Sequence, residues 1–284
     1  MTAHPLERPA LARFALLQAQ GQAARAQAVL WQALAQEPNL PRVHLALARL
    51  HWPGPDYRHW LAWLHRELQP RLYVEIGVEK GESLKLALPP TQALGIDPAP
   101  AGDPLAACTA PTRLYRQASA EFLRSPPEGC GLSEQGFDLA FVDGDHRFSS
   151  VLEDFIGLER WAAPGAVMVL HDTLPLTDRT ATEERQSGFY TGDGWKILSC
   201  LRALRPELRV VTLPIAPTGF TLVAGLDPRS QVLRERKNDI LQAYAGVGAQ
   251  RIVERPAMVA GPLGVSEAGW VRRWLRDAGV PPRN

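Results

Sequence analysis

Two histidine–aspartate motifs stand out as candidates for chemistry. One is the run DGDH at residues 143–146, and the other is the pair His171-Asp172. The other five of the seven histidines all lie within the first 65 residues. A histidine can exchange a proton near neutral pH, and two carboxylates can hold a cation such as Mg²⁺. The motifs predict proton transfer by His146 or His171, cation binding by Asp143 and Asp172, or both.

A glycine-bearing loop is a second candidate site. Residues 74–83 read VEIGVEKGES, with Gly77 and Gly81 after an apolar run. Glycines after a first parallel strand let the backbone approach a nucleotide, although an ordinary tight turn would look the same. A dinucleotide loop would need glycine where Glu79 stands. Glu75 and Glu82 add negative charge where a pyrophosphate would otherwise bind, so we expect a ligand that carries positive charge.

An acidic residue follows this loop at the spacing typical of ribose binding. Asp97 comes 20 residues after Gly77, at the end of the second apolar run. A carboxylate in that place accepts hydrogen bonds from ribose hydroxyls. A nucleoside with a cationic group and no phosphates fits both features. S-adenosylmethionine, with its sulfonium and ammonium groups, is the natural candidate for the cofactor.

Short apolar runs predict the elements that position these residues. After Pro70 we expect seven strands, at 72–76, 93–96, 114–116, 137–142, 166–170, 208–213 and 219–224. The first five alternate with possible helices, which predicts a mainly parallel sheet covered on both faces. The last two are close enough for an antiparallel hairpin. The fold class is therefore α/β with a doubly wound sheet, whose strand ends bring the loop and both motifs to one crevice.

Residues 70–225 resemble the class I, seven-strand, S-adenosylmethionine-dependent methyltransferases. The resemblance rests on the E-x-G-x-x-x-G loop and the later acid. It implies that the glycines line the methionine part of the cofactor, that Asp97 binds ribose and that Ser119 lies near adenine. From the residues alone, Ser119 is a helix N-cap. The expected cofactor-binding residues are Glu75, Gly77, Gly81, Asp97, Ser119 and Asp143.

The DGDH and HDT runs are similar to those of a narrower branch of this family, the family-24-like sugar and natural-product O-methyltransferases. This branch includes methyltransferases of the macrocin O-methyltransferase and cephalosporin-hydroxylase-associated type. In metal-dependent members, acids at the positions of Asp143 and Asp172 help to bind Mg²⁺ beside a second acid, where this chain has His171. Because of that departure, Asp145 or His146 becomes the candidate base for a hydroxyl acceptor, and we favour His146. The candidate catalytic residues are His146, Asp145 and His171.

The connection at residues 175–196 is long for a strand-to-helix loop, and such loops are usually functional. We expect it to form a lid over the acceptor, with Tyr190 and Trp195 stacking on a sugar or ring. For Trp195, anchoring the next helix to the sheet is an equally good interpretation.

The N-terminal segment is rich in helix-forming residues from 11 to 50 and resembles a tetratricopeptide repeat. The matching positions are Gly21, Ala26, Leu30, Ala33 and Pro38. Only about one and a half repeats are present, and such modules need about three units to stand alone. We therefore expect the helices to cap another part of the protein, to bind a protein partner or to mediate homo-oligomerisation. The expected division is a helical extension at 1–68, a cofactor-binding domain at 69–226 and a second helical extension at 227–284.

Charge and composition exclude several classes of partner. The net charge is only +1 and 45% of residues are apolar, so the chain lacks the signatures of nucleic-acid binding and of disorder. No run is long enough to span a membrane and the start lacks a leader pattern, so we expect a cytoplasmic protein. The three cysteines fit free thiols. By segment the net charge is +3, −6 and +4, which makes the middle domain acidic.

The preferred interpretation is a methyltransferase that acts on a hydroxyl of a sugar, glycan or small natural product. One alternative is a noncatalytic scaffold of the same fold that binds a partner through its N-terminal helices, because function follows from sites rather than folds. A nicotinamide-dependent oxidoreductase is a third interpretation, and Glu79 disfavours it.

Overall fold

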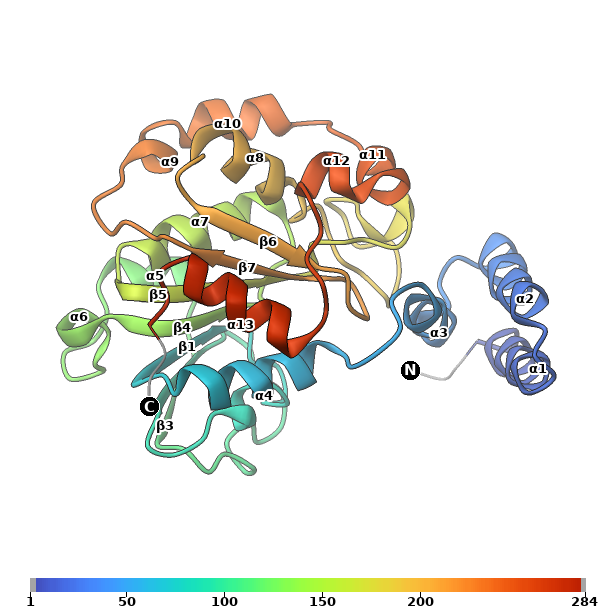
Figure 1. Ribbon diagram of the computed structural model, residues 1–284, viewed down its shortest axis with the longest axis horizontal. Helices are drawn as coiled ribbons and strands as arrows, with labels where there is room; N and C mark the ends of the chain where they lie inside the picture. The colour runs from blue at the N-terminus through green and yellow to red at the C-terminus, as the bar shows by residue number, and fades with distance from the viewer. Residues whose placement is uncertain (1–3, 282–284) are drawn as a thin grey trace.

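The computed structural model describes residues 4–281, and a seven-stranded sheet lies at its centre (Figure 1). In spatial order β3-β2-β1-β4-β5-β7-β6, β1 to β5 are parallel, and β7 runs antiparallel to both of its neighbours. The strands are β1 Leu72–Ile76, β2 Gln92–Ile96, β3 Thr112–Tyr115, β4 Phe137–Val142, β5 Ala162–His171, β6 Arg209–Leu213 and β7 Phe220–Ala224. The structure therefore confirms the predicted α/β fold and the closing antiparallel hairpin.

The register of the parallel strands aligns the candidate residues. Ile76 of β1 pairs with Ile96 of β2 on one side and with Val142 of β4 on the other, and Val142 pairs with Leu170 of β5. The residues that follow these four positions are Gly77, Asp97, Asp143 and His171. They must therefore meet at one edge of the sheet.

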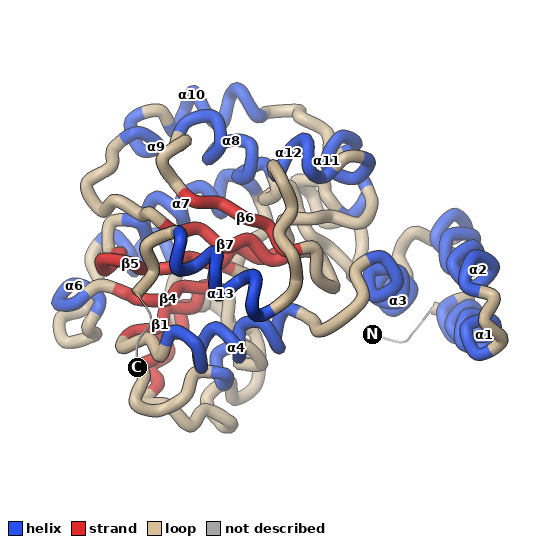
Figure 2. Tube along the Cα trace, in the orientation of Figure 1, coloured by secondary structure: helices blue, strands red, loops and turns tan. Residues whose placement is uncertain are grey.

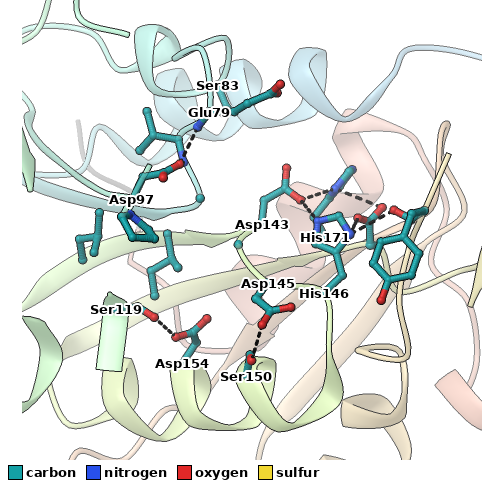
Figure 3. Close-up of a pocket in the computed structure, with 18 of the residues that line it drawn as sticks. Glu79, Ser83, Asp97, Ser119, Asp143, Asp145, His146, Ser150, Asp154 and His171 are labelled. Atoms are coloured by element: carbon teal, nitrogen blue, oxygen red, sulfur yellow. Dashed lines mark hydrogen bonds and ion pairs between the residues drawn. The ribbon is translucent and has the colours of Figure 1, made fainter. Parts of the chain in front are cut away.

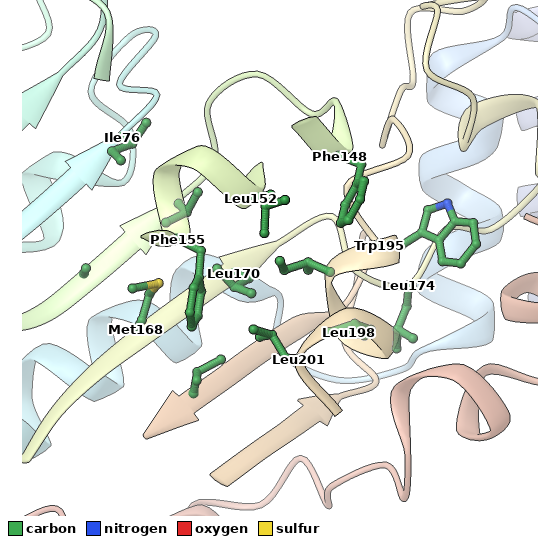
Figure 4. Close-up of a cluster of buried hydrophobic side chains, with 14 of the residues drawn as sticks. Ile76, Phe148, Leu152, Phe155, Met168, Leu170, Leu174, Trp195, Leu198 and Leu201 are labelled. Carbon is green, nitrogen blue, oxygen red and sulfur yellow. The ribbon is translucent and has the colours of Figure 1, made fainter. Parts of the chain in front are cut away.

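Helices cover both faces of the sheet (Figures 1 and 2). One face packs against α5 (Ser119–Arg124), α7 (Phe148–Glu159) and α8 (Lys196–Leu204), and Figure 4 shows the buried side chains between α7, α8 and the sheet. The other face packs against α4 (Tyr57–Leu68) and α13 (Ala268–Asp277). Successive residues of β5 alternate between the two clusters, Met168 with the first and Val169 with the second, as strand geometry requires.

The first two connections of the sheet contain no α-helix. Between β1 and β2 there is one 3₁₀ turn, Leu84–Leu86, and the β2–β3 connection consists of turns and bends. Both connections carry prolines, at 89, 90, 98, 100, 104 and 111, and proline in a helix interior costs about 3 kcal/mol. Instead, the side chains of α4, which belongs to the N-terminal segment, pack on the face of the sheet that α13 also covers.

The N-terminal hairpin is present. Helices α1 (Glu7–Ala19) and α2 (Ala23–Gln36) pack against each other, joined by a turn in which Gly21 has φ +70°, and α3 (Pro41–His51) follows. Helices α1 and α2 project from one end of the molecule, with α3 between them and the sheet (Figure 1). The tetratricopeptide character of this hairpin stays a prediction.

The remaining helices are short. In the C-terminal segment, α9 and α10 are divided at Arg236, and α11 and α12 follow within residues 245–266. These helices are α6 Leu132–Gln135, α9 Val232–Glu235, α10 Lys237–Tyr244, α11 Gln250–Glu254 and α12 Pro256–Ala260. Within residues 4–281, no helix combines the length and apolar character needed to cross a bilayer. All three cysteines are free thiols.

Candidate active site

A cleft of about 1060 Å³ opens at the edge of the sheet where the strand register aligns the candidate residues (Figure 3). Its walls come from the residues after β1, β2, β4 and β5, from the first turns of α4, α5 and α7, and from residues 185–190. Ligand pockets usually enclose about 300–1,000 Å³. This cleft therefore has room for two small molecules side by side.

The loop after β1 depends on its glycines for close backbone packing. Gly77 has φ +84°, and a Cβ there would lie 2.1 Å from the carbonyl oxygen of Asp143. Gly81 has φ +77°, and its Cβ would lie 2.1 Å from the carbonyl oxygen of Pro104. Gly77 lines the cleft, whereas Gly81 lies behind the wall and shapes the loop.

Asp97 joins the loop after β1 to the end of β2. Its Oδ2 accepts hydrogen bonds from the backbone N–H groups of Val78 (2.9 Å) and Glu79 (2.8 Å), and its Oδ1 accepts one from Ala99 (2.8 Å). An ionised carboxylate offers about four acceptor positions. Asp97 lines the cleft with acceptor capacity left, so the predicted ribose contact remains open to it.

Glu75 lies beneath this loop rather than in the cleft. Its side chain is fully buried and accepts hydrogen bonds from Tyr73 Oη (2.5 Å) and Ser83 Oγ (2.8 Å). Burial raises the pKa of Glu75 to about 8, although both hydrogen bonds act in the opposite direction. Glu75 thus supports the loop from behind, and we infer no direct cofactor contact for it.

Ser119 is paired with an acid that the sequence analysis missed. Its Oγ donates to Asp154 Oδ1 at 2.5 Å, and both residues line the cleft (Figure 3). Ser119 is the first residue of α5 and makes no capping bond, so the N-cap interpretation is wrong. Burial raises the pKa of Asp154 to about 7. Asp154 lies on the buried face of α7, where an acid gives no motif in the sequence.

The two histidine–aspartate motifs come together as predicted. His171 Nδ1 lies 3.0 Å from Asp143 Oδ1 and 3.4 Å from Asp172 Oδ1. His146 Nδ1 lies 3.1 Å from Asp172 Oδ2, and His146 Nε2 lies 3.7 Å from Asp143 Oδ1. Asp172 also accepts a hydrogen bond from Thr218 Oγ1 and has φ +55°. A non-glycine residue in that region is a form of backbone strain found mainly at functional sites.

The two histidines differ in exposure. The side chain of His171 is 6% exposed and that of His146 is 26% exposed. Burial opposes the charge on His171, but attraction by Asp143 and Asp172 outweighs it and raises the pKa of His171 to about 9. Burial likewise opposes the charge on Asp143, and His171 and His146 outweigh it and lower the Asp143 pKa. His171 is thus the cation of a buried ion pair, and His146 is the histidine that faces the cleft.

Asp145 is engaged on its own side of the cleft. Its Oδ2 accepts hydrogen bonds from Arg147 Nε (2.8 Å) and Ser150 Oγ (2.9 Å). Burial raises the pKa of Asp145, but the bonds from Arg147 and Ser150 outweigh burial and lower it. A carboxylate stabilised in this way is a weak base, which favours His146 for the base role.

The same cluster has the donor atoms of a cation site. Asp143, His146 and Asp172 each offer a ligand atom, and these atoms lie within 4.8 Å of one another. Carboxylates suit Mg²⁺ and Mn²⁺, whereas an imidazole suits Zn²⁺ and Fe²⁺. The mixed set fits a divalent cation, with His171 standing behind it where a further acid was expected.

The first turn of α4 supplies residues that the sequence analysis assigned to the N-terminal extension. Tyr57 and Arg58 line the cleft, and the Tyr57 ring lies 4.3 Å from the ring of His171. Burial, then the nearby Asp143, raises the pKa of Tyr57 to about 12. The side chain of Asp56 caps α4 by accepting hydrogen bonds from the backbone N–H groups of Arg58 and His59. In the sequence, Asp56 could have indicated where the helix starts, but no sequence pattern shows where that helix packs.

The connection between β5 and α8 reaches the cleft through Tyr190. The Tyr190 ring stacks on the His146 ring at 5.6 Å and 8°, and the Tyr190 carbonyl oxygen lies 3.1 Å from His146 Nδ1. Trp195 is only 2% exposed and donates from Nε1 to the carbonyl of Ala181. The expectation that Trp195 stacks on an acceptor is therefore wrong, because its ring anchors α8 in the core (Figure 4).

Comparisons with known proteins give one matching family model and several similar solved structures. Residues 74–173 match the model of a methyltransferase domain, the family numbered 24, and a search of curated proteins gives no match. Solved structures similar to the chain include an O-methyltransferase from Bacillus cereus in complex with SAH, at 14% identity over 69% of this chain and 89% of that one, with a TM-score of 0.45. Another is an SAH-bound methyltransferase from Podospora anserina, at 15% identity over 63% of this chain and 85% of that one, also with a TM-score of 0.45.

The matched segment begins in β1 and ends just after Asp172, so it contains the glycine loop, Asp97 and both histidine–aspartate motifs. The strands that continue it complete the seven-stranded, mainly parallel sheet that the resemblance implied. Residues 74–173 are therefore similar to a methyltransferase domain, and the predicted site residues that follow β1, β2, β4 and β5 lie within the matched segment.

Proposed function

We propose that the protein transfers the methyl group of S-adenosylmethionine to a hydroxyl of a small molecule, sugar or glycan. The observation that carries the proposal is the single cleft that joins the glycine loop and Asp97 at one end to His146 and its carboxylates at the other. A cofactor bound along the loop would present its methyl group toward His146.

The charge of the cleft supports a cationic cofactor. Eight acidic side chains line it against three from lysine and arginine and the charged His171, and a cleft lined mainly by one sign of charge attracts ligands of the opposite sign. Glu79 and Asp97 lie at the loop end, where the ammonium and ribose groups would bind. The adenine would extend toward Ser119 and Asp154 at the start of α5.

His146 is the proposed general base. The acceptor oxygen attacks the methyl carbon, the carbon–sulfur bond breaks to leave S-adenosylhomocysteine, and the hydroxyl proton passes to His146. His146 Nδ1 faces two oxygens, Tyr190 O and Asp172 Oδ2, each at 3.1 Å. A proton on Nδ1 is held by these oxygens and leaves the lone pair on Nε2. Proton transfer by such a side chain typically contributes about 10²–10⁴-fold in rate.

The acceptor half of the cleft offers rings as well as polar groups. Tyr57 lies against His171, Tyr190 lies against His146, and the Arg185 guanidinium lies 5.7 Å from the centre of the Tyr190 ring. Flat apolar faces beside hydrogen-bonding groups suit a sugar ring or a hydroxylated aromatic ring. Both acceptor classes fit this half of the cleft.

A cation-assisted form of the reaction uses the same residues. Asp143, His146 and Asp172 would hold a divalent cation, Mg²⁺ among the candidates, and the bound cation would orient the acceptor and lower the pKa of its hydroxyl. His146 cannot serve as base while its lone pair binds a metal. The two forms are therefore alternatives, and chelation separates them.

The proposal can be tested without knowing the acceptor in advance. Purified protein is incubated with trideuteromethyl S-adenosylmethionine and a small-molecule extract of the source cells, and products are sought by mass spectrometry. We expect a product that carries the labelled methyl group on oxygen and that is missing with His146→Ala. A label found only on nitrogen or carbon would contradict O-methyl transfer.

A further inference from the structure

The loop that carries Tyr190 is fastened to the N-terminal helices. Asn39, in the turn between α2 and α3, accepts a hydrogen bond on Oδ1 from the backbone N–H of Gly188, at 2.7 Å. The Phe189 ring stacks on the ring of His44 in α3, with centroids 5.1 Å apart and planes 10° apart. These contacts join residues about 145 positions apart in the sequence.

The docking surface on the N-terminal side is well defined. His44 is 3% exposed, and its Nε2 lies 3.0 Å from the carbonyl oxygen of Pro38, which orients the ring. Burial lowers the pKa of His44, so the stacked ring is neutral. A Cβ at Gly188 would lie 2.6 Å from Pro41 Cγ, so the loop backbone rests directly on the first residue of α3.

The other end of the same loop is fastened to the residues around His146. Gly194 N–H donates to the carbonyl of His146 at 2.8 Å, and Asp193 Oδ1 accepts from Phe148 N–H at 2.6 Å. A Cβ at Gly192 would lie 2.2 Å from the His146 carbonyl oxygen. Tyr190 therefore stands between two anchors, with α3 on one side and the β4–α7 connection on the other.

We propose that Asn39 and His44 are positioning residues for the methyl-transfer site. They hold Gly188 and Phe189, and through them they fix the Tyr190 ring and carbonyl against His146. The α2–α3 turn and α3 thus help to position the residues that form the acceptor half of the cleft. The catalytic consequence rests on the proposed function, but the position of His146 can be measured without an acceptor.

The test follows the His146 ring by carbon–proton correlation NMR, with the His146 signal assigned by its loss in His146→Asn. The stacked Tyr190 ring shifts this signal through its ring current, and Tyr190→Ala gives the unstacked reference. We expect Asn39→Ala and His44→Ala to move the His146 signal toward that reference. Hydrogen exchange at Gly188 should also rise by roughly 10-fold or more in Asn39→Ala, because its amide loses its acceptor.

Conservative variants separate positioning from general stability. Asn39→Asp keeps an oxygen acceptor and His44→Phe keeps a stacking ring, so both should leave the His146 signal at its wild-type position, and His44→Phe also serves if His44→Ala does not fold. Arg25→Ala, on α2 at an exposed position whose side chain donates to Gln22, is the control and should change nothing. An unshifted His146 signal in Asn39→Ala, with a clear shift in Tyr190→Ala, would overturn the inference. Absence of methyl transfer by the wild-type protein would refute the proposed function. The NMR comparison would still decide whether Asn39 and His44 position His146.

Discussion

At the scale of single residues, His146 is held through one ring nitrogen, Nδ1, which leaves Nε2 for the base role. Asp172 and the Tyr190 carbonyl face Nδ1, and Asp143 is nearest to Nε2. His171 stands behind the two carboxylates and offsets part of their negative charge. This division of roles explains why two similar sequence motifs serve different ends: one histidine faces the cleft, and the other is buried.

Removing the His146 imidazole should abolish most turnover while leaving cofactor binding intact. We expect His146→Ala to lower kcat by about 10²–10⁴-fold, the usual contribution of general-base catalysis. The dissociation constant for S-adenosylmethionine, measured by calorimetry, should stay within about two-fold of wild type, because the loop and Asp97 are untouched. His59→Ala, at an exposed position on α4, is the control. Full turnover in His146→Ala would refute the base assignment.

The buried acid Asp154 should make stability depend on pH. Its folded-state pKa of about 7 lies above the ordinary 3.8, so folding favours its protonated form. That contribution is complete below about pH 4 and is lost as the pH rises through 7. Asn at this position does not ionise, so the Asp154→Asn variant should not lose stability in this way. Its free energy of unfolding, relative to that of wild type, should therefore rise between pH 4 and pH 8, by at most about 4 kcal/mol.

Urea denaturation of wild type and Asp154→Asn at several pH values measures that difference. Asp239→Asn, at an exposed position on α10, is the matched control and should show no such trend. A constant difference between Asp154→Asn and wild type from pH 4 to 8 would show that Asp154 does not change its protonation in this range.

At the scale of elements, the loop after β1 is shaped by how closely it approaches β4. Gly77→Ala would place a methyl group 2.1 Å from the Asp143 carbonyl oxygen, so the loop must move away from the cleft. We expect the affinity for S-adenosylmethionine to fall by roughly 10-fold or more, in line with the cost of about 1 Å of misplacement. The measurement is a calorimetric titration.

Gly102 provides a matched control for that substitution. It has a similar positive φ of +66°, and a Cβ there would meet nothing within 4 Å. Gly102→Ala therefore carries the backbone strain without the clash, and it should bind S-adenosylmethionine like wild type. Equal losses in the two variants would mean that strain, rather than the contact with Asp143, sets the affinity.

The sequence could predict the strands and their ends, because parallel strands buried on both faces leave apolar runs bounded by turn residues. It could also predict that DGDH and HDT meet, since both follow strands of one parallel sheet. It could not predict that α4 lies over that sheet, because an amphipathic helix shows which face it buries but not against what. Tyr57 and Arg58 were missed for this reason. Asp154 was missed because a lone acid on the buried face of α7 forms no motif, and Trp195 was misplaced because burial is not visible in a loop.

At the scale of the whole molecule, helices from both flanking segments pack directly on the sheet. α4 and α13 share one buried face, and Arg272 of α13 forms a two-pronged ion pair with Glu67 of α4, at 2.5 and 2.6 Å. The basic flanks and the acidic middle found in the sequence therefore meet in one unit. Helices α1 to α3 lie beside the sheet, and α3 touches the loop that carries Tyr190.

Metal removal tests which form of the reaction the whole protein uses. With His146 as the base, methyl transfer should survive exhaustive chelation with little change in rate. Methyl transfer by protein treated with EDTA and then dialysed against metal-free buffer measures this, with activity before treatment as reference. Loss of activity that returns on adding Mg²⁺ or Mn²⁺, but not Na⁺, would contradict the base role and favour Asp143, His146 and Asp172 as metal ligands.

We expect the cleft at the carboxyl ends of β1, β2 and β4 to bind S-adenosylmethionine through its acidic loop end. Asp97 is the most direct residue to substitute, because it lines the cleft and also accepts hydrogen bonds from the backbone N–H groups of Val78 and Glu79. The decisive measurement is isothermal titration of S-adenosylmethionine into wild type and Asp97→Ala. We expect saturable one-site binding to wild type and a loss of affinity of roughly 10-fold or more in the variant, because hydrogen bonds to a charged group contribute about 1.5–3 kcal/mol. Absence of binding to wild type, or equal binding to both proteins, would contradict this expectation.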